Sequence, residues 1–212
     1  MGFVDVRRNN DYSIGIWRVE EDEVTLKKIV GGTYFPGLDK ITHPRRRLEW
    51  LSARSIIREF GHNGLVLYHP TRRPFLEHSH SHLSISHSYP LVAVVISHNN
   101  LVGVDIESYD RSFSKVAYKY LSPREKLWVD ENDNKRLALI WSAKEALYKL
   151  PGMEGLGGVD MDIKPFECQD NGGELDASIR IGGVVQRFKV NYYYLGNFNV
   201  AWVYCNPKTL SW

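Results

Sequence analysis

The sequence predicts a mixed α+β protein. Some segments carry apolar residues at helical spacing, whereas others alternate or form short apolar runs between turn residues, as strands do. The hydrophobic fraction of 43% and the charged fraction of 25% are those of an ordinary globular protein. A chain of 212 residues is long enough for one substantial domain or two small ones.

The first half of the chain predicts one strand and two helices. The alternation over 12–19 indicates a strand, and the charged segment 20–28 suggests a short exposed helix. A longer helix is expected over 42–61, because Pro44 suits a first helical turn and Gly61 suits a C-terminal stop. Its core-facing residues are expected to be Trp50, Ala53, Ile57 and Phe60.

The second half predicts more strands around two helices. Segments 91–97 and 101–107 are expected to form a hairpin through His98-Asn99-Asn100. Ser122-Pro123-Arg124-Glu125 is a capping box with proline at the first helical position, so a helix should begin there. The remaining expected features are a helix N-cap in 130–134, a helix end at Pro151-Gly152, a hairpin over 177–190, and strands 191–195 and 198–205 around Gly196-Asn197.

Charge and cysteine content exclude several classes of protein. The 27 basic residues are nearly matched by 25 acidic ones, so the net charge of +2 gives no nucleic-acid footprint. Two cysteines do not make a disulfide framework and fit a reducing compartment. No signal-peptide core is visible, and the longest apolar run, 91–96, is too short to span a membrane. A cytoplasmic protein without membrane or nucleic-acid partners is expected.

Two short motifs carry the chemistry. In Gly103-Val104-Asp105-Ile106-Glu107, a strand would direct both carboxylates to one face. In Trp141-Ser142-Ala143-Lys144-Glu145-Ala146-Leu147-Tyr148-Lys149, a helix would place Glu145 and Lys149 one turn apart. Three carboxylates and an ammonium group suit Mg²⁺ and a phosphate ester. Each motif alone has a structural explanation, as a solvated helix pair or the polar face of a strand.

Together, and in this order, the motifs resemble the 4′-phosphopantetheinyl transferase superfamily, whose signatures read roughly G-[IV]-D-[IV]-E and W-[ST]-x-K-E-[AS]-x-x-K. The resemblance implies two similar α+β halves related by pseudo-twofold symmetry. Residues 1–102 would form the N-terminal half with the coenzyme A phosphate contacts, and 103–212 the C-terminal half with the metal site. Chain length and the glutamate closing the first motif favour the larger, surfactin-synthetase-activating type, and a monomer.

The resemblance implies transfer of 4′-phosphopantetheine from coenzyme A to a serine of an apo carrier protein, with release of adenosine 3′,5′-bisphosphate. Asp105, Glu107 and Glu145 would bind Mg²⁺, and Glu145 would act as general base, directly or through water. Lys149 would stabilise the leaving bisphosphate. Lys144 would have a secondary phosphate-binding or structural role.

Residues in the first half match the family's coenzyme A contacts. Arg46 and Arg54 have the spacing of two helical arginines, although a basic run on a helix is more often a solvated face. Arg73 stands where the family commonly has the lysine of Gly-Lys-Pro. Ser86 and His87 match the end of an Asn-x-Ser-His-Ser motif, with Ser84 in place of asparagine.

Other interpretations remain open at this stage. His78, His80 and His82 would share one face of a strand and suggest Zn²⁺ or Ni²⁺, although surface histidines in a polar loop are a sufficient explanation. A non-catalytic coenzyme A-binding module and a metal-dependent phosphodiesterase are the alternative functions. The sequence does not specify fatty acid, polyketide or nonribosomal peptide biosynthesis.

A surface for the carrier protein is expected after the acidic pair, where basic and apolar residues would meet an acidic helix; a solvated helix face explains them equally well. The residues are Lys115, Lys119, Tyr120, Leu121 and Arg124.

Overall fold

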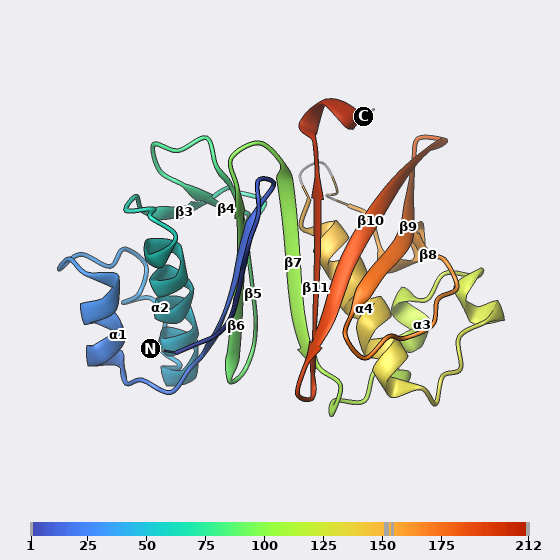
Figure 1. Ribbon diagram of the computed structural model, residues 1–212, viewed down its shortest axis with the longest axis horizontal. Helices are drawn as coiled ribbons and strands as arrows, with labels where there is room; N and C mark the ends of the chain where they lie inside the picture. Colours follow the sequence, from blue (N-terminus) through green and yellow to red (C-terminus); the bar gives the residue numbers. More distant parts are fainter. Residues whose placement is uncertain (1, 151–152, 154, 211–212) are drawn as a thin grey trace. The chain divides into compact units, whose positions relative to one another are not determined.

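The computed structural model describes residues 2–150, 153 and 155–210. It divides into two compact units, an N-terminal unit that ends at His98 and a C-terminal unit that begins at Asn99. Each unit combines helices with an antiparallel sheet, which confirms the predicted α+β class (Figure 1).

The N-terminal unit has a four-stranded antiparallel sheet in the order β1-β2-β6-β5. Its helix α2 packs against β6 and β2 and buries Leu51, Ile56 and Ile57. The small β3-β4 sheet was not anticipated from the sequence. The elements are β1 (Phe3–Arg8), β2 (Ser13–Arg18), α1 (Glu23–Val30), α2 (Pro44–Glu59), β3 (Val66–Tyr68), β4 (Pro74–Leu76), β5 (His82–Ser88) and β6 (Leu91–Ser97).

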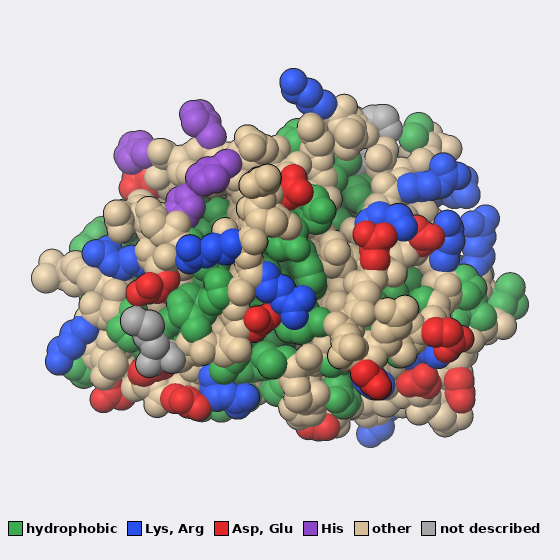
Figure 2. All heavy atoms as spheres, in the orientation of Figure 1, with side chains coloured by type: hydrophobic (Ala, Val, Ile, Leu, Met, Phe, Trp, Pro, Cys, Tyr) green, Lys and Arg blue, Asp and Glu red, His purple; other side chains and the backbone are tan. Residues whose placement is uncertain are grey.

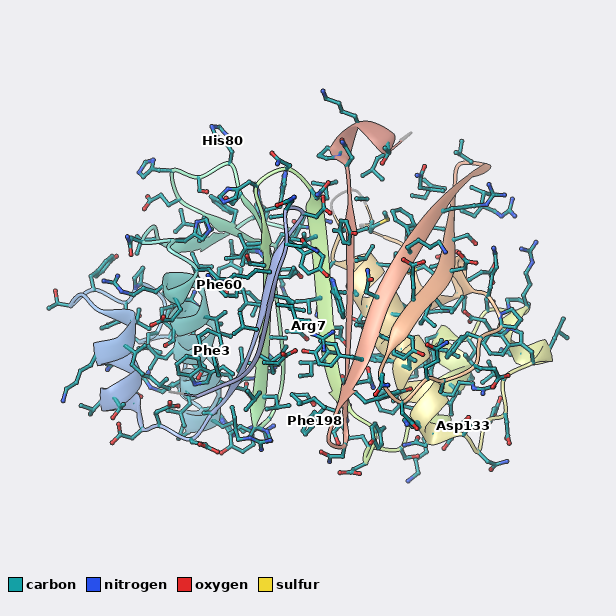
Figure 3. The ribbon with its side chains drawn as sticks, in the orientation of Figure 1. Phe3, Arg7, Phe60, His80, Asp133 and Phe198 are labelled. Carbon is teal, nitrogen blue, oxygen red and sulfur yellow. The ribbon has the colours of Figure 1, made fainter. Side chains whose placement is uncertain are left out.

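Aromatic packing joins the first strand to the end of α2. Phe3 meets Trp17 edge to face, with ring centroids 4.9 Å apart, and stacks on Phe60 at 6.3 Å (Figure 3). Trp17 is fully buried. Such aromatic pairs stabilise a core beyond their buried area.

The C-terminal unit has a five-stranded antiparallel sheet in the order β7-β11-β10-β9-β8. The carboxylate of Asp133 caps α4 by accepting from the Arg136 backbone N–H at 3.0 Å. The elements are β7 (Leu101–Ser108), η1 (Ser114–Val116), α3 (Ala117–Tyr120), η2 (Glu125–Leu127), α4 (Asn134–Tyr148), η3 (Gly158–Asp160), β8 (Met161–Ile163), β9 (Gly173–Ile181), β10 (Val184–Leu195), β11 (Phe198–Cys205) and η4 (Pro207–Thr209).

Helix α4 lies directly against β7 and β11. Most of its residues are buried, as expected for a helix that is apolar on nearly all sides. At the closest approach, a Cβ added to Gly103 would lie 1.9 Å from the Ala146 carbonyl oxygen. Only glycine allows the strand and the helix to come this near.

The two units share a chain order. In the N-terminal unit, β2 is followed by α2 and then by the β5-β6 hairpin, whose second strand pairs with β2. In the C-terminal unit, β7 is followed by α4 and later by the β10-β11 hairpin, whose second strand pairs with β7. Each unit is therefore built around the same strand, helix and hairpin.

Most predicted elements are present, but the hairpin between 91–97 and 101–107 is wrong. Both edges of β6 are already occupied, by β2 and β5, and β7 pairs with β11 instead. The capping box at Ser122 forms, yet it begins only the single 3₁₀ turn η2. Pro151-Gly152 lies outside the described residues.

The alternative in which three histidines share one strand face is not formed, because β5 begins at His82. His78 and His80 lie in an exposed loop before β5, and His78 has a positive φ of 55°. Figure 3 shows His80 on this loop, and Figure 2 shows histidine side chains at the surface.

None of the described helices is long and apolar enough to cross a membrane.

Candidate active site

Strand β7 positions two carboxylates on one face of the C-terminal sheet. Asp105 and Glu107 alternate with Val104 and Ile106, which are buried in the core. Asp105 itself is buried, whereas the Glu107 side chain is 14% exposed. Glu107 accepts from Arg111 at 2.6 Å.

Lys149, the residue that ends α4, reaches back to this strand. Its Nζ lies 2.8 Å from Asp105 Oδ1 and donates to the Val104 carbonyl oxygen at 2.7 Å. The two motifs are therefore joined by a short ion pair. The Lys149 side chain is 25% exposed, whereas the Asp105 side chain is 7% exposed.

Glu145 lies within electrostatic range of the same groups. Burial raises the pKa of the Glu145 carboxyl, and the negative charges of Asp105 and Glu107 raise it further, while Lys149 opposes them. The structure therefore brings together four of the five charged groups of the two motifs, all except Lys144. A cation close to Glu145 would relieve this unfavourable environment.

The donors of this cluster fit a hard divalent cation in type and charge. Carboxylate oxygens are the ligands that Mg²⁺ prefers. Two of the three carboxylates already have a cationic side chain as a neighbour, Lys149 at Asp105 and Arg111 at Glu107. Within the described residues, no group of three or more His, Cys, Asp or Glu side chains is already arranged as a metal site.

Lys144 has a structural environment, although it stands next to Glu145 in the motif. Its side chain is 3% exposed. Nζ donates to Glu125 Oε2 at 2.5 Å and to the carbonyl oxygens of Tyr120 at 2.7 Å and Gly158 at 2.8 Å. Three partners use the three donors of an ammonium group, so the structural role of Lys144 is the one that its contacts support.

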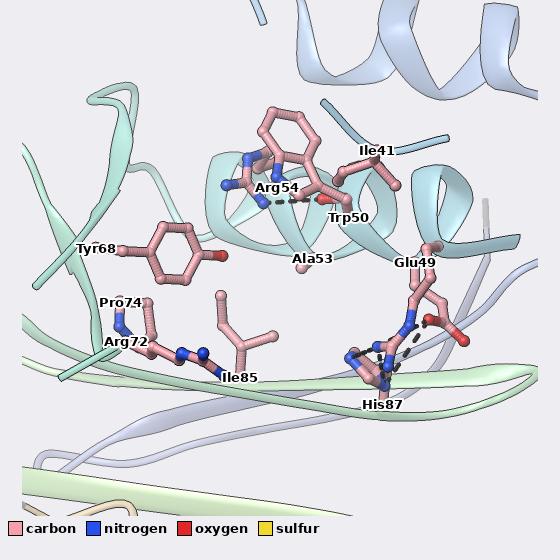
Figure 4. A pocket seen from close by; sticks show the side chains of 11 residues that line it. Ile41, Glu49, Trp50, Ala53, Arg54, Tyr68, Arg72, Pro74, Ile85 and His87 are labelled. Atoms are coloured by element: carbon pink, nitrogen blue, oxygen red, sulfur yellow. Dashed lines mark hydrogen bonds and ion pairs between the residues drawn. The ribbon is translucent and has the colours of Figure 1, made fainter. Parts of the chain in front are cut away.

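A pocket of about 360 Å³ in the N-terminal unit gathers three of the predicted phosphate contacts, Arg46, Arg54 and His87. Figure 4 shows Glu49 and His87 at one end of it and Arg54, Tyr68 and Arg72 at the other. Its apolar lining is Ile41, Trp50, Ala53, Pro74 and Ile85. The pocket thus combines charged groups with apolar walls, as ligand-binding sites do.

Arg54 is the most buried basic residue of this pocket, at 8% exposure. Its guanidinium lies 3.2 Å from the centroid of the Trp50 ring, and Nη1 donates to the Trp50 carbonyl oxygen at 3.1 Å. Burial lowers the pKa of Arg54 to about 10, so the group stays positive at neutral pH. Trp50 packs against the core, as expected, and also forms a wall of the pocket with Arg54.

Two predicted contacts do not line the pocket. Ser86 is buried, whereas His87, the next residue of β5, is exposed, because successive strand residues point to opposite faces. Arg72, rather than Arg73, is the lining residue of the loop, where it has a positive φ of 66°. Matching Arg73-Pro74 to the Lys-Pro pair of the family motif could not reveal the backbone turn at Arg72, which decides which arginine faces the pocket.

Sequence analysis missed Glu49, which lies beneath the exposed arginines at the start of α2. Its side chain is 4% exposed, and Oε1 accepts from Arg45 Nε at 3.2 Å. Oε2 lies 3.5 Å from Arg46 Nη1 and 3.8 Å from His87 Nδ1. The helical spacing of Arg45 and Glu49 is visible in the sequence, but the burial of the Glu49 side chain is not.

The segment proposed for the carrier protein is only partly exposed. Tyr120 and Leu121 are core residues, at 3% and 0% exposure, so their expected surface role is wrong. Tyr118 and Leu127 are exposed instead, at 65% and 86%. A pocket of about 330 Å³ adjoins this segment and includes Lys119, Trp141, Glu145 and Tyr148 in its lining.

Fold and site together define an α+β protein in which two short motifs bring carboxylates and a lysine into one cluster. Residues 101–201, slightly less than half of the chain, match the family model of the 4′-phosphopantetheinyl transferase superfamily. The C-terminal unit is therefore similar to this superfamily, which confirms the resemblance and supports a phosphopantetheinyl transferase activity in general. A comparison with curated proteins gives no match.

Proposed function

We propose that the protein transfers the 4′-phosphopantetheine group of coenzyme A to a serine hydroxyl of an apo carrier protein and releases adenosine 3′,5′-bisphosphate. The observation that carries this proposal is the cluster of Asp105, Glu107, Glu145 and Lys149 inside the segment matched to the family. Coenzyme A is the co-substrate, and the reaction depends on Mg²⁺.

The three carboxylates would hold Mg²⁺, which would neutralise charge on the pyrophosphate of coenzyme A. Lys149 orients the pyrophosphate and stabilises the leaving bisphosphate as a point charge. Its ion pair with Asp105 keeps the ammonium group close to the carboxylates.

Glu145 accepts the proton of the attacking serine, directly or through water. The serine oxygen forms a bond to the β-phosphorus, and the bond between this phosphorus and the bridging oxygen of the bisphosphate breaks. The raised pKa of Glu145 makes its carboxylate a stronger proton acceptor than an exposed glutamate. The N-terminal pocket, with Arg46, Arg54 and His87, binds the nucleotide phosphates.

Intact-mass spectrometry of an apo carrier protein tests the reaction. Incubation with this protein, coenzyme A and Mg²⁺ should add the mass of one phosphopantetheine, and EDTA should prevent the gain. The Glu145→Gln variant is the matched control for contaminating transferase. No gain with several unrelated carriers, despite coenzyme A binding, would favour a binding module, and hydrolysis of coenzyme A without carrier would favour a phosphodiesterase.

The carrier protein binds through an acidic helix at the exposed segment of the C-terminal unit. Lys115, Lys119 and Arg124 supply positive charge there, and Tyr118 and Leu127 supply exposed apolar surface. Charge reversal at Lys119 and Arg124 should raise the carrier KM more at low salt than at high salt, with the coenzyme A KM unchanged. An unchanged carrier KM would remove this surface from the proposal.

A further inference from the structure

Glu49 is a buried acidic residue in a pocket otherwise suited to anions. Arg45 and Arg46 are about half exposed, at 50% and 58%, whereas the Glu49 side chain below them is 4% exposed. Burying a carboxylate is costly unless it is paired and hydrogen-bonded. Its contacts with Arg45, Arg46 and His87 offset this cost.

The third arginine of the run has a different arrangement. Arg47 donates to Glu23 of α1 at 2.6 and 2.7 Å and to the carbonyl oxygens of Leu38 and Ile41. Neither Arg47 nor Glu23 lines the 360 Å³ pocket. The pair therefore ties α1 and the following loop to α2 and offers a matched structural control for Glu49.

Arg46 keeps one side of its guanidinium available. Within the described chain, its contacts with Glu49 and with the His87 ring are all made through Nη1. The edge formed by Nε and Nη2 is a fork of two parallel donors, the geometry that binds phosphate in a bidentate manner. Glu49 and His87 therefore fix one end of the guanidinium while the other edge remains for a ligand.

We propose that Glu49 is a positioning residue for phosphate binding: together with His87, its buried carboxylate holds Arg46 so that the Nε–Nη2 edge of the guanidinium faces the nucleotide phosphates of coenzyme A. This inference rests on the proposed function of the pocket. Glu49 does not touch the phosphate itself. It fixes side chains that would otherwise have to be ordered when the ligand binds, a cost that would reduce affinity.

Glu49 could act through its negative charge or by orienting the neighbouring donors, and the two roles predict opposite changes in anion affinity when residue 49 is neutral. If Glu49 only reduced the positive charge of the pocket, Glu49→Gln would bind an anion more tightly. If Glu49 holds the donors in place, Glu49→Gln loses charge-assisted hydrogen bonds and binds an anion less tightly. The direction of the change in affinity therefore distinguishes the two roles.

Calorimetric titration of the full chain with adenosine 3′,5′-bisphosphate is the test, with adenosine as the probe that lacks phosphate. Glu49→Gln should weaken bisphosphate binding roughly tenfold, the usual effect of losing one charge-assisted hydrogen bond, and change adenosine binding little. The KM for coenzyme A should rise with kcat unchanged. Glu23→Gln should lower thermal stability and leave bisphosphate affinity within about twofold of wild type.

Glu49→Asp provides the second variant, because it keeps the charge and withdraws it by one methylene. It should weaken bisphosphate binding less than Glu49→Gln does. Wild-type affinity or tighter binding in either folded variant would overturn the inference while leaving the proposed function intact. Failure of the wild-type protein to bind bisphosphate would overturn the assigned function of the pocket and this inference with it.

Discussion

The two units use the same order of strand, helix and hairpin but place opposite charges on it. In the N-terminal unit, the start of α2 presents exposed arginines above one buried carboxylate. In the C-terminal unit, the end of α4 and strand β7 present carboxylates, with Lys149 as their close counter-ion. The shared backbone topology therefore specifies neither the sign of the charges nor the end of the helix at which they gather.

Both helices place a charge where the helix dipole disfavours it. The arginines of α2 lie at the positive N-terminal end, and Glu145 lies in the last turn of α4, at the negative end. Each disfavoured charge has an opposite charge three or four residues later, Glu49 in α2 and Lys149 in α4. In both helices, the disfavoured charge is therefore offset by a neighbouring side chain of opposite charge.

The largest effect is expected in the C-terminal unit. Glu145→Gln removes the proposed base and a proposed metal ligand, so kcat should fall by about 10²–10⁴-fold. Because burial and two neighbouring carboxylates disfavour the charge of Glu145, the melting temperature should stay the same or rise. Carrier transfer followed by mass and calorimetric unfolding measure both. Near-normal turnover in a folded variant would contradict the assignment.

The two lysines of the signature helix should separate stability from chemistry. Lys144→Met leaves Glu125 buried without its counter-charge, and should cost about 3–5 kcal/mol of unfolding free energy. Lys149→Met removes a partly exposed group, and should cost less stability but more activity. Denaturant unfolding compares the variants, and the double variant Lys144→Met with Glu125→Gln should recover part of the lost stability, because the amide oxygen can still accept a backbone N–H. Equal destabilisation by both single changes would show that Lys149 is structural too.

In the N-terminal unit, the expected effect is on binding and not on the chemical step. Arg46→Gln should raise the KM for coenzyme A by about tenfold or more with kcat nearly unchanged, because the change removes a charged donor but leaves the carboxylates in place. Steady-state kinetics at saturating carrier protein measure both constants. If kcat fell by the same factor as kcat/KM, Arg46 would act in the chemical step. The two units would then no longer differ in whether they affect binding or catalysis.

The smallest effect is a pH dependence of stability in the C-terminal unit. The pKa of Glu145 is raised above its ordinary value of 4.5, so the folded state holds this proton more tightly than the unfolded state does. The stability of the wild-type protein, measured against that of Glu145→Gln, should therefore be highest below pH 4.5. It should fall as the pH rises from 4.5 through the raised pKa of Glu145. Thermal unfolding in EDTA between pH 4 and 8 measures the difference. Mg²⁺ should reduce it, and a difference independent of pH would contradict the assigned environment.

The sequence predicted local features that depend on periodicity and turn residues. Helices α2 and α4 and the hairpin at Gly182-Gly183 are present because spacing, capping and glycine turns act over a few residues. The prediction of a hairpin between β6 and β7 was wrong, because a three-residue connection can join two strands of the same sheet or strands of two different sheets. The partners of β6 come from β2 and β5, which no local signal reveals.

The candidate site was predicted as far as its residue types were distinctive. The charged cluster of Asp105 and Lys149 follows from two motifs, but the buried contacts of Lys144 depend on Tyr120, Glu125 and Gly158, which are distant in sequence. Glu49 was overlooked because a glutamate four residues after an arginine is typical of any exposed helix. The pair of Arg45 and Glu49 differs from an ordinary surface pair because the surrounding fold buries Glu49.

Gly103 sets the spacing of the carboxylates although it has no side chain. Its strand meets the Ala146 carbonyl oxygen so closely that an added methyl group would lie 1.9 Å away. Asp105 lies two residues after Gly103, and Glu145 directly precedes Ala146, so this contact limits how far apart the strand and helix carboxylates can be. A substitution elsewhere in the core can be absorbed by side chains, whereas one methyl group at position 103 must widen the gap. The separation of the strand and helix carboxylates therefore depends on a backbone contact at a residue without a side chain.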